Sequence, residues 1–242
     1  MPRSARLVLP GIPLHVIQRG VNRAALFIDD EDRRHYLRLL RNACRKQAVA
    51  IHAFVLMGNH VHLLITPSTV EGLAPAMRQC GQNYVQYFNK RHVRSGTLLE
   101  GRFKSCLVDS DGYLLMVHRY IELNPVRAAM VAFPEEYRWS SVRVYLGLEH
   151  NPMLTPHPCY TLLGPTPEAR ANAYSEWLRA SIQPDERERI VIYVAQERAL
   201  GSPRFQDMVG RALQRSVVCR PAGRPVKETG DQQTIGQRPG TA

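Results

Sequence analysis

Two histidines, His60 and His62, stand one residue apart in the otherwise apolar stretch "LMGNHVHLLITP" (56–67). Residues i and i+2 of a β-strand point to the same face of a sheet, so we expect the two imidazoles to project together. Neighbouring imidazoles on a rigid strand form half of a site for one metal ion and leave positions for other ligands. The alternative is two polar residues on the wet face of a half-exposed sheet, because His-x-His is a short pattern.

The segment "HRYIELNPVRAAMV" (118–131) adds a phenol and an amide. Tyr120 and Asn124 are four residues apart in a predicted helix, so they share a face. A tyrosine phenol can serve as a nucleophile, and a nearby divalent cation would polarise the phosphate that it attacks. The side-chain oxygen of Asn124 would be a third ligand.

Two further residues of this helix have alternative roles. Tyr113, seven residues before Tyr120, is on the same face and is the rival nucleophile. We favour Tyr120 because Asn124 lies beside it one turn later. Glu122 is predicted to point away from Tyr120 and to form an ion pair with Arg119 or Arg127.

The pattern of apolar residues predicts the elements that position these side chains. Alternation and turn residues indicate strands, whereas Leu37, Leu40 and Cys44 recur at helical spacing. The predicted strands cover 13–20, 50–57, 60–66 and 100–108, and the predicted helices cover 29–47, 68–92 and 110–124. A Ser68–Glu71 capping box is expected to start the second helix, and Pro125 to end the third at Asn124. The order βαββαβ followed by a helix predicts an α+β fold, a ferredoxin-like antiparallel sheet with helices packed on it.

The C-terminal part of the chain differs from the first part in its composition and in its predicted elements. We predict a catalytic domain over residues 1–145, a Pro-rich linker over 146–166 and a helical region over 167–215. Within that region the helices 185–200 and 202–214 could form a DNA-binding helix-turn-helix, although a plain helical hairpin is the commoner arrangement. Residues 216–242 have too few apolar side chains to fold and are predicted to be a disordered basic tail.

The charge balance points to a polyanionic partner. The 32 Lys and Arg residues exceed the 21 Asp and Glu residues and give a net charge of +11. Such an excess is typical of proteins that bind nucleic acid. Phosphate contacts are expected from basic residues near the predicted site, with solvated surface charge as the alternative: Arg19, Arg23, Arg102, Lys104 and Arg127.

The cysteines and the apolar runs bear on the compartment. The five cysteines are scattered and form no CxxC pair, which favours reduced thiols and a cytoplasmic protein. The N-terminal stretch lacks a long apolar core followed by a cleavage site. No apolar run approaches the roughly 20 residues that span a bilayer. We therefore expect no membrane association.

Four motifs in this order resemble one known family. "MGNHVHLLITP" resembles the histidine–hydrophobe–histidine motif of the single-tyrosine HUH nucleases, and "RYIELNPVRA" is similar to the tyrosine segment of the IS200/IS605-like transposases. Together with "HVIQRG" and "GRFKS", these segments are most similar to the REP-associated tyrosine transposases. The resemblance covers roughly residues 10–145.

The resemblance implies a ferredoxin-like, metal-dependent enzyme that nicks and rejoins single-stranded DNA through a 5′-phosphotyrosine. By position, His60 and His62 would bind Mg²⁺ or Mn²⁺, Asn124 would be the third ligand, and Tyr120 would be the nucleophile. The expected substrate is single-stranded DNA near a hairpin of the REP type. The enzyme would act as a monomer or a homodimer.

Two other functions remain open at this point. A non-catalytic ferredoxin-like protein that binds DNA or RNA would share the basic charge and the sheet. A metal-dependent hydrolase of a small phosphoester would use water in place of Tyr120, but it would not need so large a positive charge.

Overall fold

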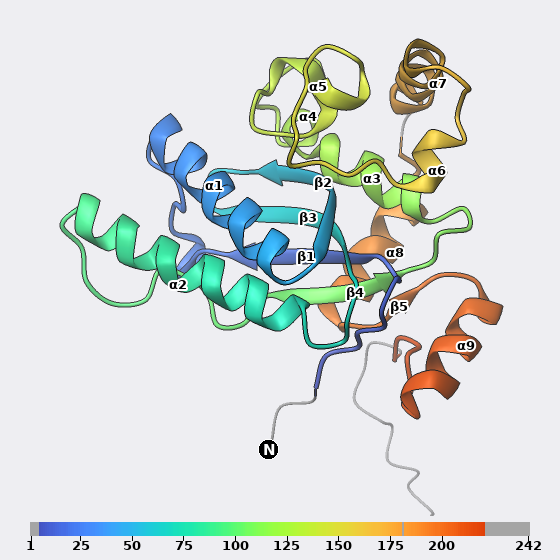
Figure 1. Cartoon of the computed structure of the whole chain (residues 1–242), viewed down its shortest axis with the longest axis horizontal. Coiled ribbons are helices and arrows are strands. Elements are labelled where there is room, and N and C mark those ends of the chain that lie inside the picture. Colours follow the sequence, from blue (N-terminus) through green and yellow to red (C-terminus); the bar gives the residue numbers. More distant parts are fainter. Residues whose placement is uncertain (1–4, 181, 221–242) are drawn as a thin grey trace, which may run out of the picture.

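The computed structural model describes residues 5–180 and 182–220 (Figure 1). One sheet and its flanking helices account for the first half of the chain. In chain order the elements of that half are β1 (Leu14–Arg19), a short 3₁₀ turn (Val21–Arg23), α1 (Asp30–Lys46), β2 (Val49–Leu56), β3 (His60–Pro67), α2 (Leu73–Arg91), β4 (Lys104–Val108) and α3 (Leu114–Glu122). The second half contains α4 (Asn124–Arg127), a 3₁₀ turn (Pro134–Glu136), α5 (Val142–Tyr145), α6 (Pro158–Thr161), α7 (Pro167–Arg179), α8 (Pro184–Ala195), β5 (Ala199–Leu200) and α9 (Pro203–Leu213).

The strands form a sheet in the order β2-β3-β1-β4-β5. β1 lies between β3 and β4 and pairs with both in antiparallel fashion, as the ferredoxin-like prediction requires. The α+β prediction is therefore confirmed. The sheet also has a strand that was not predicted, β5, which pairs in parallel with β4 and makes the sheet mixed.

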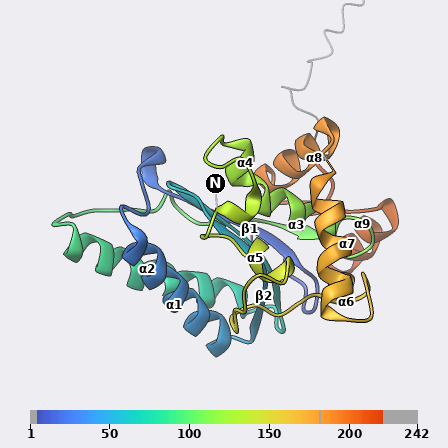
Figure 2. The same ribbon diagram turned by 90° about the horizontal axis from the view of Figure 1, so that it is seen from above.

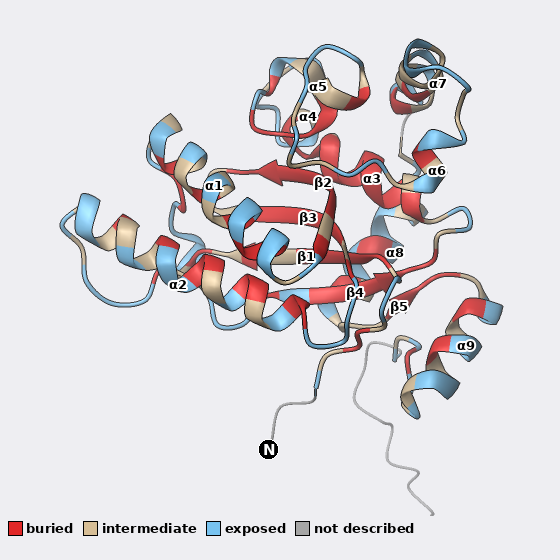
Figure 3. Ribbon diagram, in the orientation of Figure 1, coloured by how far each residue is buried: buried red, intermediate tan, exposed pale blue. Residues whose placement is uncertain are grey.

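Helices cover both faces of this sheet. Figure 2 shows α1 and α2 on one face and α3 and α8 on the other. The apolar side chains of Val61, Leu63 and Ile65 are fully buried, as expected for the face beneath the first two helices. His62 on the opposite face is only 3% exposed. Figure 3 shows the strands buried almost throughout, so the histidine face is not the wet face of a half-exposed sheet.

α2 begins later than its predicted capping box. The Ser68 N–H donates to the Ala48 carbonyl at 3.0 Å, which prolongs the pairing of β2 with β3 instead of starting a helix. Gly72 caps α2, and a Cβ on it would lie 2.7 Å from the Gln47 carbonyl oxygen. The close approach of these two backbones therefore sets the start of α2 at Leu73.

α3 is shorter than predicted and is followed at once by α4. α3 ends at Glu122, and α4 begins at Asn124 with Pro125 in its first turn. Proline suits the first turn of a helix because its missing N–H has no partner there in any case. Pro125 therefore starts a short new helix beside the tyrosine segment.

The Pro-rich segment 146–166, predicted to be a linker, packs against the sheet. The Thr155 N–H donates to the Ile51 carbonyl at 2.8 Å, at the outer strand of the sheet. Tyr160 of α6 joins a second apolar cluster, which consists of Val142, Tyr145, Tyr160, Tyr174 and Leu178. This cluster packs α5, α6 and α7 together, so the segment is part of the folded body.

A strand replaces the turn of the expected helix-turn-helix. β5 stands between α8 and α9 and pairs with β4, while α8 itself packs on the sheet. Ser216 to Arg220, which belong to the predicted tail, remain folded: Val217 is 3% exposed and accepts a hydrogen bond from Ala199. The rest of that tail lies outside the described residues.

The described ranges contain no helix that combines the length and the apolar character needed to cross a membrane. All five cysteines are free thiols, and Cys44, Cys80 and Cys106 are buried.

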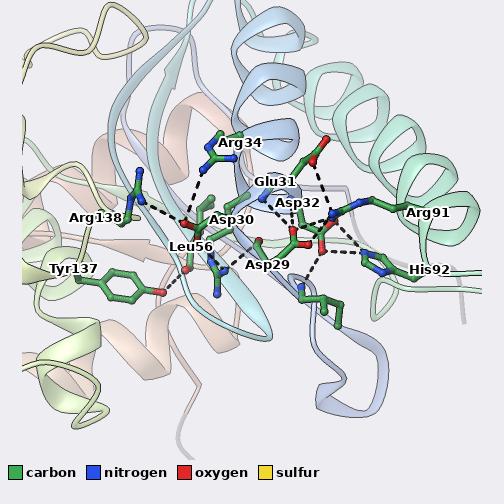
Figure 4. Close-up of polar contacts among 12 residues, drawn as sticks. Asp29, Asp30, Glu31, Asp32, Arg34, Leu56, Arg91, His92, Tyr137 and Arg138 are labelled. Carbon is green, nitrogen blue, oxygen red and sulfur yellow. Dashed lines mark hydrogen bonds and ion pairs between the residues drawn. The ribbon is translucent and has the colours of Figure 1, made fainter.

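An ion-pair network joins the N-terminus of α1 to the C-terminus of α2 (Figure 4). Asp29 caps α1 by accepting from the N–H groups of Glu31 and Asp32. Arg91 of α2 donates to Asp29 at 2.7 Å and to the fully buried Asp32 carboxylate at 2.6 Å. His92 lies 3.0 Å from the other Asp32 oxygen. The network therefore fixes the two helices that cover one face of the sheet.

We expect Asp32→Asn to lower the free energy of unfolding by about 2 kcal/mol at pH 7, because it removes charged hydrogen bonds from a buried position. Burial alone would raise the Asp32 pKa, but the hydrogen bonds from Ile28, His92 and Arg91 outweigh it and hold the pKa below its ordinary value. The stabilisation is therefore present above the unfolded pKa of about 4 and is lost as the pH falls below it.

Urea unfolding between pH 7 and pH 3 tests this expectation. The acid-induced loss of stability should be shallower in Asp32→Asn than in the wild type. Glu71→Gln, at an exposed position outside this network, is the control and should change the unfolding free energy by less than about 0.5 kcal/mol. Equal stability of the wild type and Asp32→Asn at pH 7 would contradict the role given to this carboxylate.

Candidate active site

The two histidines of β3 share a face with alternate residues of β1. His62 lies opposite Ile17, and His60 lies opposite Arg19 in the antiparallel pairing. His15 is on the same face, and its Nε2 atom is 2.9 Å from Nδ1 of His62. The strand pairing thus places three imidazoles on one side of the sheet, two of which were predicted to act together.

α3 lays Tyr120 against these imidazoles. The Tyr120 ring centroid is 5.8 Å from that of His15 and 5.8 Å from that of His62. Tyr120, Asn124, His60 and His62 all line one cavity of about 330 Å³, which we call the histidine cavity. Residues that are about 60 positions apart in the sequence therefore meet at one place, as the chemistry expected of them requires.

All three imidazoles are neutral near pH 7. Burial, with a smaller contribution from Arg19, lowers the pKa of His60 to about 4. Burial together with Arg127 lowers the pKa of His15 to about 3. Burial and the two neighbouring imidazoles hold the His62 pKa well below its ordinary value. Neutral imidazoles keep a nitrogen lone pair, which metal binding requires.

The hydrogen bonds orient the lone pairs. Asn59 donates its amide N–H to the Arg23 carbonyl at 3.1 Å, so its Oδ1 faces Nδ1 of His60 at 2.7 Å. An amide oxygen only accepts, so His60 carries its hydrogen on Nδ1 and has the lone pair on Nε2. When His62 donates from Nδ1 to His15, its own Nε2 lone pair is likewise available. Such partners of the second nitrogen are common around metal-binding histidines.

Asn124 is held by its own helix and by Arg127. Its amide nitrogen donates to the carbonyls of Tyr120 and Ile121 at 2.9 and 3.2 Å, and its Oδ1 accepts from Arg127 at 2.8 Å. The Arg127 guanidinium lies over the Tyr120 ring with 4.0 Å between its carbon and the ring centroid. The amide oxygen has a second lone pair, so it can still accept another bond.

The basic residues predicted to meet phosphate lie in and near the same cavity. Arg19, Arg102 and Lys104 line it, although Arg102 precedes β4 instead of lying within it. Arg23 is outside the lining and contributes the carbonyl that orients Asn59. Arg127 is largely exposed to solvent, but its guanidinium contacts the Tyr120 ring and the Asn124 side chain. Tyr113 is not among the lining residues and accepts a hydrogen bond from Arg189.

α8 closes one side of the cavity, which sequence reasoning missed. Val191, Val194 and Ala195 line it, and Val194 is 5% exposed. The run "ERIVIYVA" is amphipathic, which predicts a helix with one buried face, but it does not say what the face covers. The position of α8 depends on β5, which ties its C-terminal end to the sheet.

A buried polar cluster on the other side of α3 corrects the prediction for Glu122. Its carboxylate accepts hydrogen bonds from the hydroxyls of Ser141 and Tyr174, both at 2.6 Å, and lies 3.6 Å from His118. Arg119 instead pairs with Glu186. Glu122 does point away from Tyr120, but it is fully buried. It binds Ser141, which precedes α5, and Tyr174 of α7, two residues that the local sequence does not place beside it.

The donor set can be compared with what a metal ion needs. No group of three or more His, Cys, Asp or Glu side chains suited to a metal occurs in residues 5–180 and 182–220. The histidine cavity offers the two Nε2 lone pairs of His60 and His62 and the Oδ1 of Asn124. Two imidazoles and one amide leave positions for water and phosphate oxygens, which is the partly open set that a catalytic divalent cation uses. The residues therefore fit such an ion.

The fold and this site define a basic α+β protein in which two strand histidines face a helix tyrosine. The sequence model of the family described as Transposase IS200 like matches residues 9–124. The segment that carries the histidines and Tyr120 therefore matches the IS200-like transposases. No curated protein sequence matches the chain.

Two solved structures are similar to the chain, and the first of them, with a TM-score above 0.5, shares its fold. One is described as the structure of the REP-associated tyrosine transposase bound to a REP hairpin; it has 14% identity and a TM-score of 0.54, and the match covers 66% of this chain and 93% of that one. The other, from Deinococcus radiodurans R1, is described only provisionally as a transposase. It has 18% identity and a TM-score of 0.35, and the match covers 56% of this chain and 98% of that one.

We expect Glu122→Ala to lower the free energy of unfolding by about 3 kcal/mol, since it leaves the Ser141 and Tyr174 hydroxyls without their buried acceptor. Chemical denaturation measures this. Glu176→Ala, at an exposed position of α7, is the control and should be close to neutral. If the two variants are equally stable, the buried cluster does not hold α3 as described.

Proposed function

We propose that this protein is a single-strand DNA nicking and strand-transfer enzyme that forms a covalent 5′-phosphotyrosine intermediate. One observation carries the proposal: the Tyr120 ring lies 5.8 Å from the His62 ring in a cavity that His60 and Asn124 also line. The match of residues 9–124 to the IS200-like transposases supports it. Residues 1–145 would carry the reaction, while α8 from the C-terminal region closes the cavity.

Tyr120 is the nucleophile in this proposal. Its phenol oxygen attacks the phosphorus of the scissile phosphate, and the bond from phosphorus to the 3′ oxygen breaks. The phenol proton is released, and the departing oxygen takes up one proton to become a 3′-OH. The 5′ phosphate stays on Tyr120. Attack by a 3′-OH on this phosphotyrosine reverses the step and joins two strands, so no external energy source is required.

His60 and His62 would hold Mg²⁺ or Mn²⁺ through Nε2, with Asn124 as the third ligand through Oδ1. When bound, the ion supplies Lewis-acid polarisation of the phosphate. Asn59 and His15 orient the two imidazoles, and Arg127 orients Asn124 and the Tyr120 ring. Imidazole is a softer ligand than Mg²⁺ prefers, so Mn²⁺ should serve at least as well.

Arg19, Arg102, Lys104 and Arg127 would contact the phosphates on either side of the scissile bond, with Arg23 beside them. The net charge of +11 favours a polyanionic substrate. A solved structure with the same fold is described as bound to a REP hairpin, which supports a substrate in which single-stranded DNA adjoins a hairpin. The free cysteines suit a reducing compartment, which we take to be the cytoplasm.

We expect Tyr120→Phe to abolish the covalent adduct while leaving DNA binding within about twofold, because the ring and its contacts remain and only the nucleophilic oxygen is lost. The measurement is a denaturing gel of the protein with labelled single-stranded DNA and Mn²⁺. Tyr113→Phe is the control and should retain the adduct. An adduct formed by Tyr120→Phe would remove Tyr120 from its role, and no adduct from the wild type would favour a non-catalytic binder.

Loss of either strand histidine should act through the metal. We predict that His60→Ala and His62→Ala each reduce Mn²⁺-dependent cleavage by at least about 100-fold, since each removes one of few ligands. Calorimetric titration with Mn²⁺ should show weaker binding in both variants. His35→Ala, at a histidine of α1 that is remote from the cavity, should bind and cleave like the wild type. Full cleavage in the presence of EDTA would contradict the metal role.

A further inference from the structure

A groove separate from the histidine cavity runs between α2 and the loop that leads into β4. It has a volume of about 780 Å³, and its walls include Gln18, Arg78, Gln82, Gln86, Arg102 and Phe103. Positions 74, 78, 82 and 86 of α2 recur every four residues and therefore face the groove as one stripe. Gly81 lets the loop approach, because a Cβ there would lie 3.0 Å from Leu99. We call this feature the α2 groove.

The lining of the α2 groove has the chemistry of a nucleobase site. The exposed Gln82 and Gln86 present amides that can both donate to and accept from base edges. Gln18 is buried, and its amide nitrogen donates to the Gly101 carbonyl at 3.5 Å. Met77, Val85 and Leu99 supply an apolar surface for a base face. The Arg6 guanidinium lies 3.7 Å from the Phe103 ring centroid, and the Arg6 side chain is 12% exposed. Guanidinium planes are surfaces on which unpaired bases stack. The residues that line this groove include no carboxylate.

The α2 groove and the histidine cavity lie on opposite faces of the sheet but share one residue. Gln18 lines the groove, whereas its β1 neighbours Ile17 and Arg19 line the cavity. Arg102 lines both, because the loop before β4 passes around the end of the sheet.

A third hollow, of about 620 Å³, shares Gly101, Arg102 and Phe103 with the α2 groove. It shares Glu100, Arg102 and Lys104 with the histidine cavity. Arg102, Lys104, Arg198 and Arg215 line it, against the two acidic residues Glu100 and Glu197. The three hollows therefore adjoin one another at Arg102, which lines all of them.

We propose that the α2 groove is a base-reading subsite, which holds an unpaired base of the substrate strand and selects the sequence beside the cleavage position. The inference rests on the proposed function for the identity of the strand as DNA. Arg102 contacts the phosphate between the two sites, and the amides of Gln82 and Gln86 contact the edge of the base. Selection at this subsite would be separate from the chemistry at Tyr120.

The test measures the contribution of bases to binding, apart from cleavage. Fluorescent 12-nucleotide probes of dA, dT and dC, and an abasic 12-mer with the same backbone, are titrated by anisotropy in the Tyr120→Phe background without metal. We expect at least one base-containing probe to bind about tenfold more tightly than the abasic probe, as one stacked and hydrogen-bonded base would provide. Gln82→Ala combined with Gln86→Ala should reduce that ratio about fivefold or more and leave abasic binding unchanged.

The exposed Asn83→Ala, on the same helix but outside the groove lining, is the matched control and should keep the wild-type ratio. An unchanged ratio in the double glutamine variant would overturn the subsite, even if the wild type forms the covalent adduct. A different result is that the double glutamine variant loses its preference for base-containing over abasic DNA while the wild type forms no covalent adduct. That result would overturn the proposed chemistry and retain the subsite. The two failures are therefore distinguishable.

Discussion

The packing of α3 on the histidine face of the sheet is the contact on which the site depends. It places the Tyr120 ring 5.8 Å from His15 and His62, and it buries imidazoles that an open sheet would leave in water. Burial keeps these imidazoles neutral, because the charged form loses its solvation. The same contact therefore sets both the position of the phenol and the ligand character of the histidines.

α3 is fixed by contacts on the side that faces away from Tyr120 as well as by its packing on the sheet. The Glu122 carboxylate, two residues after Tyr120, binds Ser141 beside α5 and Tyr174 of α7, so the C-terminal helices determine how the tyrosine helix sits. A buried carboxylate tolerates few alternative arrangements, because losing a partner leaves an uncompensated polar group. The region after residue 145 thus supports the site from two directions, through this cluster and through α8.

The local pattern predicted the βαββαβ order, because alternation and helical spacing are properties of short windows. It also predicted that His60 and His62 share a face and that Tyr120 neighbours Asn124. The start of α2 was misplaced because the contact of Gly72 with the Gln47 carbonyl is not visible in the helix itself. β5 was missed because a two-residue strand such as Ala199–Leu200 has no periodicity and exists only through its pairing with β4.

The sequence by itself determined the residue types, their spacing along each element and the excess of positive charge. Those are enough to specify which side chains share a face, since the backbone geometry of a strand or a helix sets that locally. Only the tertiary structure decided that Tyr120 meets the histidines, that His15 joins them, that α8 closes the cavity and that Glu122 is buried instead of ion-paired with Arg119. Each of these depends on contacts between residues far apart in the chain, and such contacts form only when whole elements pack against one another.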